Sequence, residues 1–191
     1  MYIVVLMTLW ATRWNWKYFG ITRPDWLTTI VKAFLFAIGL FILNDFVVQP
    51  LVEFYFGKVD LSEVSGMEGN LPLYILFLFL GWILGGFCEE IIYRGYVLKR
   101  LAAILGETTK AWLLAAVTAA VVFGFAHNYQ GPSGIMSTAI IALLFGLIFL
   151  LNKNNLMVLV FTHGIYNMIA ITLLYLGKAR IIVDRVNELI L

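Results

Sequence analysis

The chain has 191 residues, of which 62% are hydrophobic and 13% charged, and its formal net charge is +2. Soluble domains are nearer about 45–50% apolar and about 25% charged, so the composition excludes an ordinary soluble globular domain. The small net charge gives no indication of nucleic-acid binding, and the single cysteine, Cys88, excludes an intrachain disulfide. We therefore predict an integral membrane protein.

Six apolar segments are candidates for membrane-spanning helices, each of which needs about 20 mostly apolar residues. The first, from Met1 to about Ala11, fits a short first span better than a signal peptide, because no basic residue precedes it and no small-residue cleavage site follows. The other five run over 26–52, 71–98, 111–127, 135–151 and 156–176. This pattern predicts an all-α, polytopic transmembrane bundle of about six spans.

The charges between the spans predict an orientation. The loops that carry basic residues, and that the positive-inside rule places in the cytoplasm, are 13–25, 99–110 and 152–155. The acidic loop 53–70 is then external. The segment 178–191 is amphipathic, and we expect it to lie on the membrane surface or against a neighbouring helix. The cations in this segment that fall outside, against the rule, are Lys178, Arg180 and Arg185.

Ionisable side chains inside the predicted spans are few. Inserting each one near the bilayer centre costs at least about 2.5–3.5 kcal/mol of free energy, so such residues persist where they form pairs or have a function. The ionisable residues of the third, fourth and sixth spans are Glu89, Glu90, Arg94, His127 and His163, and Asn167 accompanies His163. The second span contains Lys32 and Asp45, which have no local partner pattern. We look for function in the first set.

Glu90 and Arg94 lie four residues apart, in the orientation that favours a helical ion pair. A guanidinium stays charged and can hold a carboxylate with two N–H groups, so we expect Arg94 to neutralise Glu90. Glu89 lies about 100° around the helix and shares that pairing less easily, which leaves it available as a general base. An ion pair that only joins two helices accounts for Glu90 and Arg94 but not for the second carboxylate.

The two histidines of the chain lie in other spans. His163 and Asn167 are four residues apart, so they project from one helix face, and His127 ends a span. Alone, these residues could serve as interhelical hydrogen-bond partners or packing residues. Together with a Glu they supply a base for water and donors for an oxyanion, which amide hydrolysis requires. The same Glu and His side chains could instead bind zinc, with water in an open position.

Three motifs follow one another on successive predicted helices: Glu-Glu-x-x-x-Arg at 89–94, Phe-x-x-x-His at 123–127 and His-x-x-x-Asn at 163–167. In this order they resemble the CAAX protease and bacteriocin-processing (CPBP, or Abi) family of membrane proteases, which is related to the type II CAAX prenyl endopeptidase. The resemblance extends over 81–167. It implies an intramembrane endopeptidase that acts on membrane-associated substrates, CAAX-like or leader-type.

The resemblance also implies roles for the motif residues. By position, Glu89 and His127 would activate the water, and His163 and Asn167 would form the oxyanion site. The two residues that would support this geometry are Glu90 and Arg94. The family is described both as zinc-dependent and as a metal-free glutamate protease. No His-Glu-x-x-His motif is present, and we favour the metal-free mechanism; a zinc-dependent one would use Glu89, His127 and His163 as ligands.

The same resemblance suggests an organisation and a setting. N-terminal membrane segments and a polar loop (1–70) precede a CPBP-like catalytic core (71–176) and an amphipathic tail (177–191). The expected partners are a membrane-associated peptide or protein substrate and the lipid bilayer, without nucleic acid. We expect a multi-pass protein of a prokaryotic cell membrane.

Three alternatives come from other classes. A serine protease of rhomboid type would pair Ser133 with His163, but it leaves the carboxylates of the third span without a role, and a Gly/Pro/Ser cluster between spans is also an ordinary turn. A non-proteolytic scaffold or bacteriocin self-immunity protein on the same fold would not need all of the motif residues. A transporter with a midplane ion site would show inverted repeats, which the sequence lacks.

The depth of the motif residues predicts a tilted or bent helix. At about 1.5 Å per residue, Glu89 and His163 lie about 15 Å from the cytoplasmic edge, whereas His127 lies about 25 Å from it. Straight parallel helices would leave His127 too far from the other two. We therefore predict either a bend of the third helix at Gly85-Gly86 or a fourth helix that is tilted or begins beneath the membrane surface.

Overall fold

The computed structural model describes residues 2–21, 25–153 and 155–190. Met1, Leu191 and parts of the predicted loops 13–25 and 152–155 lie outside the described residues. Within them the regular structure is entirely helical, without a strand, which confirms the predicted all-α class.

The helices follow one another in a simple order. The α-helices are α1 (Tyr2–Ala11), α2 (Trp26–Leu43), α3 (Gln49–Phe56), α4 (Leu71–Leu80), α5 (Lys99–Ile104), α6 (Thr109–Phe125), α7 (Gly131–Leu151), α8 (Leu156–Tyr175) and α9 (Ile181–Ile190). The π-helical segments are η1 (Asn44–Val48), η3 (Gly81–Glu89) and η4 (Ile91–Leu98), and the 3₁₀ segments are η2 (Ser62–Met67) and η5 (Asn128–Gln130). The π segments join α-helices without a break, so Trp26–Phe56 and Leu71–Ile104 are each continuous.

Four of the described helices are long and apolar enough to cross a membrane: Trp26–Phe56, Leu71–Ile104, Asn128–Leu151 and Leu156–Tyr175. The apolar helix α6 has 17 residues. The first predicted span is the helix α1, but its 10 residues would reach only about 15 Å into a hydrocarbon core about 30 Å thick. The helical membrane bundle is thus confirmed, and α1 is too short to cross such a core as a single helix.

Polar side chains mark where several of these apolar helices begin. The capping residues are Asp25, Asn70, Thr108 and Asn155, which precede α2, α4, α6 and α8. Each accepts a hydrogen bond from a backbone N–H of the first helical turn, which would otherwise have no intrahelical partner. The sequence therefore fixes the helix starts locally.

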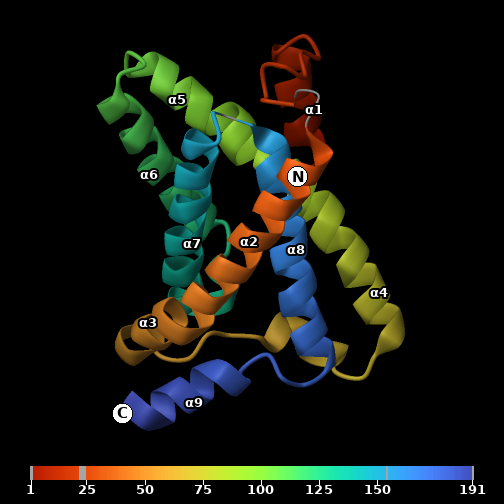
Figure 1. Cartoon of the computed structure of the whole chain (residues 1–191). Coiled ribbons are helices and arrows are strands. Elements are labelled where there is room, and N and C mark those ends of the chain that lie inside the picture. The colour runs from red at the N-terminus through yellow and green to blue at the C-terminus, as the bar shows by residue number, and fades with distance from the viewer. Residues whose placement is uncertain (1, 22–24, 154, 191) are drawn as a thin grey trace.

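Helix α8 lies at the centre of the arrangement. It packs against α2 on one side and against η3 on the other, while α6 packs on α7. Figure 1 shows α7 and α8 running nearly parallel, with the long helix from α4 to α5 crossing obliquely beside them. The helix that carries Glu89 is thus oblique to its neighbours, whereas the predicted bend at Gly85-Gly86 or tilt of the fourth span stays a prediction.

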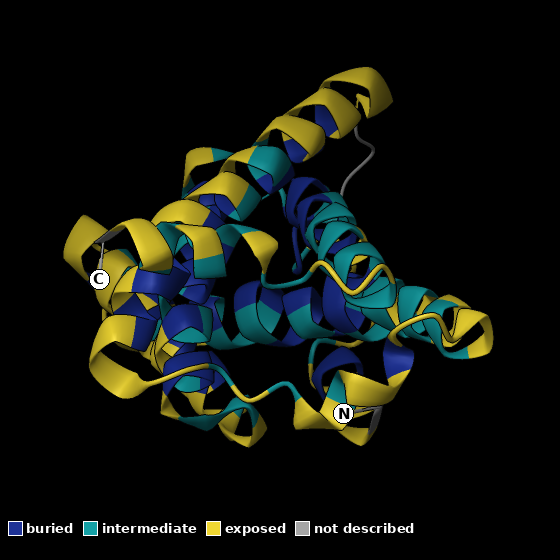
Figure 2. Ribbon diagram, turned by 90° about the horizontal axis from the view of Figure 1, so that it is seen from below, coloured by how far each residue is buried: buried dark blue, intermediate teal, exposed yellow. Residues whose placement is uncertain are grey.

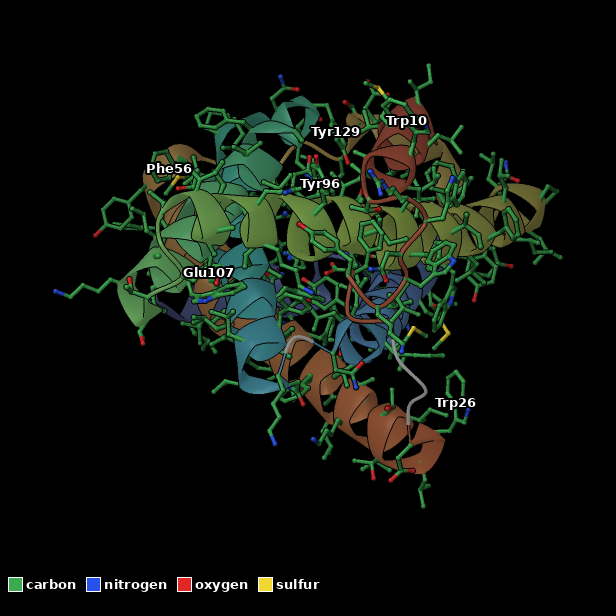
Figure 3. The ribbon with its side chains drawn as sticks, turned by 90° about the horizontal axis from the view of Figure 1, so that it is seen from above. Trp10, Trp26, Phe56, Tyr96, Glu107 and Tyr129 are labelled. Carbon is green, nitrogen blue, oxygen red and sulfur yellow. The ribbon has the colours of Figure 1, made fainter. Side chains whose placement is uncertain are left out.

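The outward faces of the bundle are apolar. Figure 2 shows buried residues gathered inside and exposed residues on the outside of the helices. The exposed large side chains include Leu27, Phe34, Phe79 and Phe125, a surface that suits lipid better than water. In Figure 3 the rings of Trp10, Trp26 and Phe56 project away from the bundle, as aromatic side chains do at membrane interfaces.

The residues before α2 cover the C-terminal end of the third predicted span. Phe19 is fully buried against Gly95, where an added Cβ would lie 3.0 Å from the ring. Lys99 donates to the carbonyl of Tyr18, and the backbone of Leu156 donates to the carbonyl of Gly20 at 3.1 Å. This segment therefore joins the ends of two helices that carry the motif residues.

The tail is tied to α3 by a buried ion pair. The guanidinium of Arg180 donates to both carboxylate oxygens of Glu53, at 2.9 and 2.8 Å, and the Glu53 side chain is only 2% exposed. The following helix, α9, packs on α3 and η1. This confirms that the tail lies against a neighbouring helix.

The same part of the structure explains how the tail tolerates cations that, in the predicted orientation, fall outside against the positive-inside rule. Arg180 also donates to Asp184 at 2.8 Å, and Arg185 pairs with Glu188 at 3.0 Å. The hydrogen bonds to Glu53 raise the pKa of Arg180. Although burial acts in the opposite direction, Arg180 holds the pKa of Asp184 below its usual range. Two of the three tail cations are therefore neutralised within the protein, and the predicted orientation stays a prediction.

Candidate active site

The two adjacent carboxylates lie where the third span departs from α-helical geometry. Residues 81–89 and 91–98 form the π segments η3 and η4, in which backbone hydrogen bonds run from i to i+5. Such wide turns occur often at functional sites, because they turn side chains away from their α-helical directions. The site begins on this helix.

Glu90 and Arg94 form the ion pair that the sequence predicts. The Nη1 of Arg94 donates to Glu90 Oε1 at 2.9 Å, and the side chains are 0% and 3% exposed. The Nη2 of Arg94 donates to the carbonyl of Ala142 on α7 at 2.9 Å. The guanidinium carbon also lies 5.0 Å from the ring centre of Phe123 and 5.3 Å from that of Phe145. Arg94 is therefore held by two further helices.

His163 lies between the two carboxylates. Its Nδ1 donates to Glu90 Oε1 at 2.7 Å, and its Nε2 lies 3.9 Å from Glu89 Oε2. Glu90 thus joins the third span to α8 and fixes the orientation of the imidazole ring. The second oxygen, Glu90 Oε2, is buried and has no hydrogen-bond partner within the described part of the chain.

Close approach of α8 to η3 depends on glycines. Asn167 Nδ2 donates to the carbonyl of Gly81 at 3.1 Å. A Cβ added at Gly85 would clash with Asn167 Nδ2 and lie 3.5 Å from His163 Nε2, and one at Gly86 would lie 3.0 Å from the carbonyl oxygen of α8 at position 160. The absence of side chains at Gly81, Gly85 and Gly86 therefore admits His163 and Asn167.

A cavity of about 310 Å³ brings the remaining motif residues together, since His127, His163 and Asn167 all line it. His127 Nδ1 lies 2.9 Å from the carbonyl oxygen of Phe123. Because a carbonyl only accepts, Nδ1 carries the proton, and in the neutral ring Nε2 is free to accept one. His127 is thus placed as an acceptor in the cavity that His163 and Asn167 share.

Among the motif residues that line the cavity, Glu89 approaches only His163. It does not line the cavity, and no hydrogen bond between Glu89 and His127 is found among the described residues. Its contact is the 3.9 Å approach to His163 Nε2. Catalytic hydrogen bonds are often long before a substrate binds, so the 3.9 Å distance does not rule out Glu89 as a base.

The three residues that a zinc-dependent mechanism would use do not fit a metal ion in this arrangement. In the part of the chain that is described, no three or more His, Cys, Asp or Glu side chains are placed to hold one. The hydrogen bonds of His163 and His127 to protein groups use Nδ1 of each imidazole.

Ser133 has a structural contact instead of a catalytic one. It is fully buried, and its hydroxyl donates to the carbonyl of Gly57. It does not line the cavity that contains His163. The Ser–His pair of a rhomboid-type protease is therefore not formed.

The sequence analysis missed the residues that allow the helices to meet. Gly81 and Gly85 are four residues apart, the spacing at which small residues let membrane helices approach closely, and this signal was present in the sequence. Phe145, which flanks Arg94 together with the motif residue Phe123, carried no such signal, because aromatic residues are common throughout the chain.

The fold and the site define a helical membrane protein with a Glu–His–Asn cluster buried in its interior beside a cavity. The family model described as type II CAAX prenyl endopeptidase Rce1-like matches residues 71–169, just over half of the chain, and this range contains all three motifs. The chain belongs to this family, as the motifs predict, and the family points to a CAAX-type endopeptidase in the membrane. No curated protein and no solved structure matches the chain.

Proposed function

We propose that this protein is an intramembrane endopeptidase that hydrolyses a peptide bond of a membrane-associated substrate, CAAX-like or leader-type, by a metal-free mechanism. One observation carries the proposal. The imidazole of His163 is held at Nδ1 by Glu90 and faces Glu89 with Nε2, at a cavity that His127 and Asn167 also line. A scaffold protein would not need a base and oxyanion donors converging on one cavity.

In the first step, Glu89 and His127 activate a water molecule. One of the two bases accepts a proton from the water as its oxygen attacks the carbonyl carbon of the scissile bond, and the carbonyl π electrons move to the oxygen. The free Nε2 of His127 can accept a hydrogen bond from the water. The result is a tetrahedral intermediate with a negative oxygen.

In the second step, His163 and Asn167 stabilise that oxygen. The amide of Asn167 has a second N–H beyond the one used on Gly81, and His163 can donate from Nε2 when it carries a second proton. The C–N bond then breaks, and the proton taken from water passes to the leaving nitrogen. One peptide bond and one water are consumed, and one carboxylic acid and one amine are formed.

The four long apolar helices support a multi-pass protein, and we place it in a prokaryotic cell membrane. The residues exposed on its outside are apolar, so the bilayer is its surroundings and the substrate reaches the cavity from within it. The partners are thus a membrane peptide or protein and lipid, with no role for nucleic acid.

The test is cleavage of a panel of membrane peptides by the purified protein in detergent. Wild type is compared with Glu89→Gln and with Ser133→Ala, each with and without a strong chelator. We expect Glu89→Gln to lose cleavage, Ser133→Ala to keep it, and the chelator to have no effect.

Two results would change the assignment. Loss of cleavage on chelation, with recovery on adding zinc, would replace the metal-free mechanism by a metal-dependent one. Absence of cleavage by wild type, together with an unchanged cellular phenotype of Glu89→Gln, would favour the scaffold or self-immunity function.

A further inference from the structure

Asp45 is a buried acid that the proposed chemistry does not use. It lies in the π segment η1, in the middle of the helix Trp26–Phe56, and is 7% exposed. Within the described residues no cation lies at ion-pair distance from it. Its hydrogen bond comes from its neighbour, as Asn44 Nδ2 donates to Oδ1 at 2.9 Å, and no hydrogen bond to Oδ2 is found in the part of the chain that the structure describes. An ionisable residue at membrane depth is costly, and one without a partner points to function.

Asp45 lies on the wall of the cavity that contains His163 and Asn167. Two aromatic residues, Phe41 and Tyr166, line the same cavity, and their ring centres are 6.5 Å apart. Phe41 precedes Asp45 by four residues on the same helix. A carboxylate beside aromatic faces is the combination that binds a primary ammonium or a guanidinium, through a charged hydrogen bond and cation–π attraction.

The charges of the cavity lining are of one sign once internal pairs are removed. Its two arginines are occupied, Arg94 by Glu90 and Arg180 by Glu53 and Asp184. The other acidic side chains that line the cavity besides Asp45 are Asp60 and Glu63. A cationic ligand is therefore attracted, whereas a carboxylate would meet like charge.

We propose that Asp45, with the rings of Phe41 and Tyr166, forms a subsite for a lysine or arginine side chain of the substrate. This inference rests on the proposed function and specifies its substrate class: a membrane-associated peptide with a basic residue near the bond that is cut. The bound cation supplies the partner that Oδ2 lacks and neutralises the buried charge.

The test measures binding and does not depend on cleavage. A fluorescently labelled apolar helical peptide with one lysine, and its twin with norleucine at that position, are titrated with the protein in detergent, and the lysine is moved along the peptide. Wild type is expected to bind the lysine peptide about 10- to 100-fold more tightly at one position, the ratio that a hydrogen bond to a charged group supports.

Four variants locate the effect. Asp45→Asn should remove the preference, and Asp45→Glu should retain most of it. Glu107→Gln, a matched carboxylate-to-amide change in the exposed loop between α5 and α6 (Figure 3), should leave the ratio unchanged. If Asp45→Asn does not fold, Phe41→Leu carries the test, because loss of the ring should lower the ratio several-fold.

The outcomes separate this inference from the proposed function. Equal affinity of wild type for the two peptides at every position, or no binding of either, overturns the subsite. Asp45-dependent preference in a protein that cleaves no peptide supports the subsite and rejects the proposed function. Cleavage of the lysine and norleucine peptides at equal rates, together with equal affinities, supports the proposed function and rejects the subsite.

Discussion

Glu90 and His163, which are 73 positions apart in the sequence, are joined by a hydrogen bond of 2.7 Å between a carboxylate oxygen and an imidazole nitrogen. The carboxylate is completely buried and does not line the cavity. It therefore acts on the imidazole instead of on a substrate, and we assign it a positioning role.

The first prediction concerns this contact. Glu90→Gln should lower kcat about 100-fold, since a small displacement of a reacting group has an effect of that order, with little change in KM. The double variant Glu90→Gln/His163→Ala should be no worse than His163→Ala alone, because the two residues act as a unit. Steady-state kinetics of the two single variants and the double variant check this, and independent, additive losses would contradict it.

The second prediction concerns the glycine at the helix contact. Gly85→Ala should abolish most activity and lower stability by about 1–3 kcal/mol, because the new Cβ meets the Asn167 amide. The control is Gly39→Ala in α2, where an added Cβ has no neighbour within 4 Å; it should be neutral or stabilise by up to about 1 kcal/mol. Cleavage rates and thermal unfolding in detergent report both, and equal effects of the two substitutions would argue against the close approach.

The third prediction concerns the tail. Arg180→Ala should lower the free energy of unfolding by about 3–5 kcal/mol, because it leaves the buried carboxylate of Glu53 unpaired. The matched control is Arg185→Ala, whose pair with Glu188 is exposed and should contribute only about 0–1 kcal/mol. Thermal or denaturant unfolding of both variants measures the difference, and similar values would show that Glu53 finds another partner.

The fourth prediction is a pH dependence at the same place. The pKa of Asp184 is lower in the folded protein, so its contribution to stability is present above its ordinary pKa of about 3.9 and is lost as pH falls through the lower folded value. Because the side chain is partly exposed, the contribution should not exceed about 1 kcal/mol.

The check compares the melting temperatures of wild type and Asp184→Asn as the pH is lowered. The difference between the two proteins should be constant near neutral pH and should vanish in strong acid. A difference that grows on acidification would reverse the sign and reject the assignment. Glu188→Gln, on the exposed side of the tail, serves as control and should differ little from wild type throughout.

Contacts within one helix were predictable from the sequence, and contacts between distant helices were not. Glu90 and Arg94 are four residues apart, so helical periodicity was enough to pair them. The contact of Glu90 with His163 depends on how the third span and α8 are rotated and on the π segments, which no local pattern encodes. The sequence showed that Arg180 violates the positive-inside rule, but its partner, Glu53, lies 127 positions earlier and was not predicted.

The surroundings of Asp45 also depend on contacts between distant helices. The sequence places no cation at helical spacing from it, and the structure adds that no distant cation forms an ion pair with it among the described residues. Its place beside Phe41 and Tyr166 follows from the packing of α2 on α8. Only the assembled bundle connects it to the cavity of His163.

The pairing of Glu53 with Arg180 also sets an order on biogenesis. A ribosome delivers Glu53 to the translocation machinery 127 residues before its counter-ion emerges, so every nascent chain passes through a stage in which this carboxylate has only the nearby donors Gln49 and Val59. That stage ends only when the tail docks. Docking of Arg180 therefore completes the charge pairing of the second helix, and nascent chains stalled before residue 180 should be preferred substrates for membrane quality control.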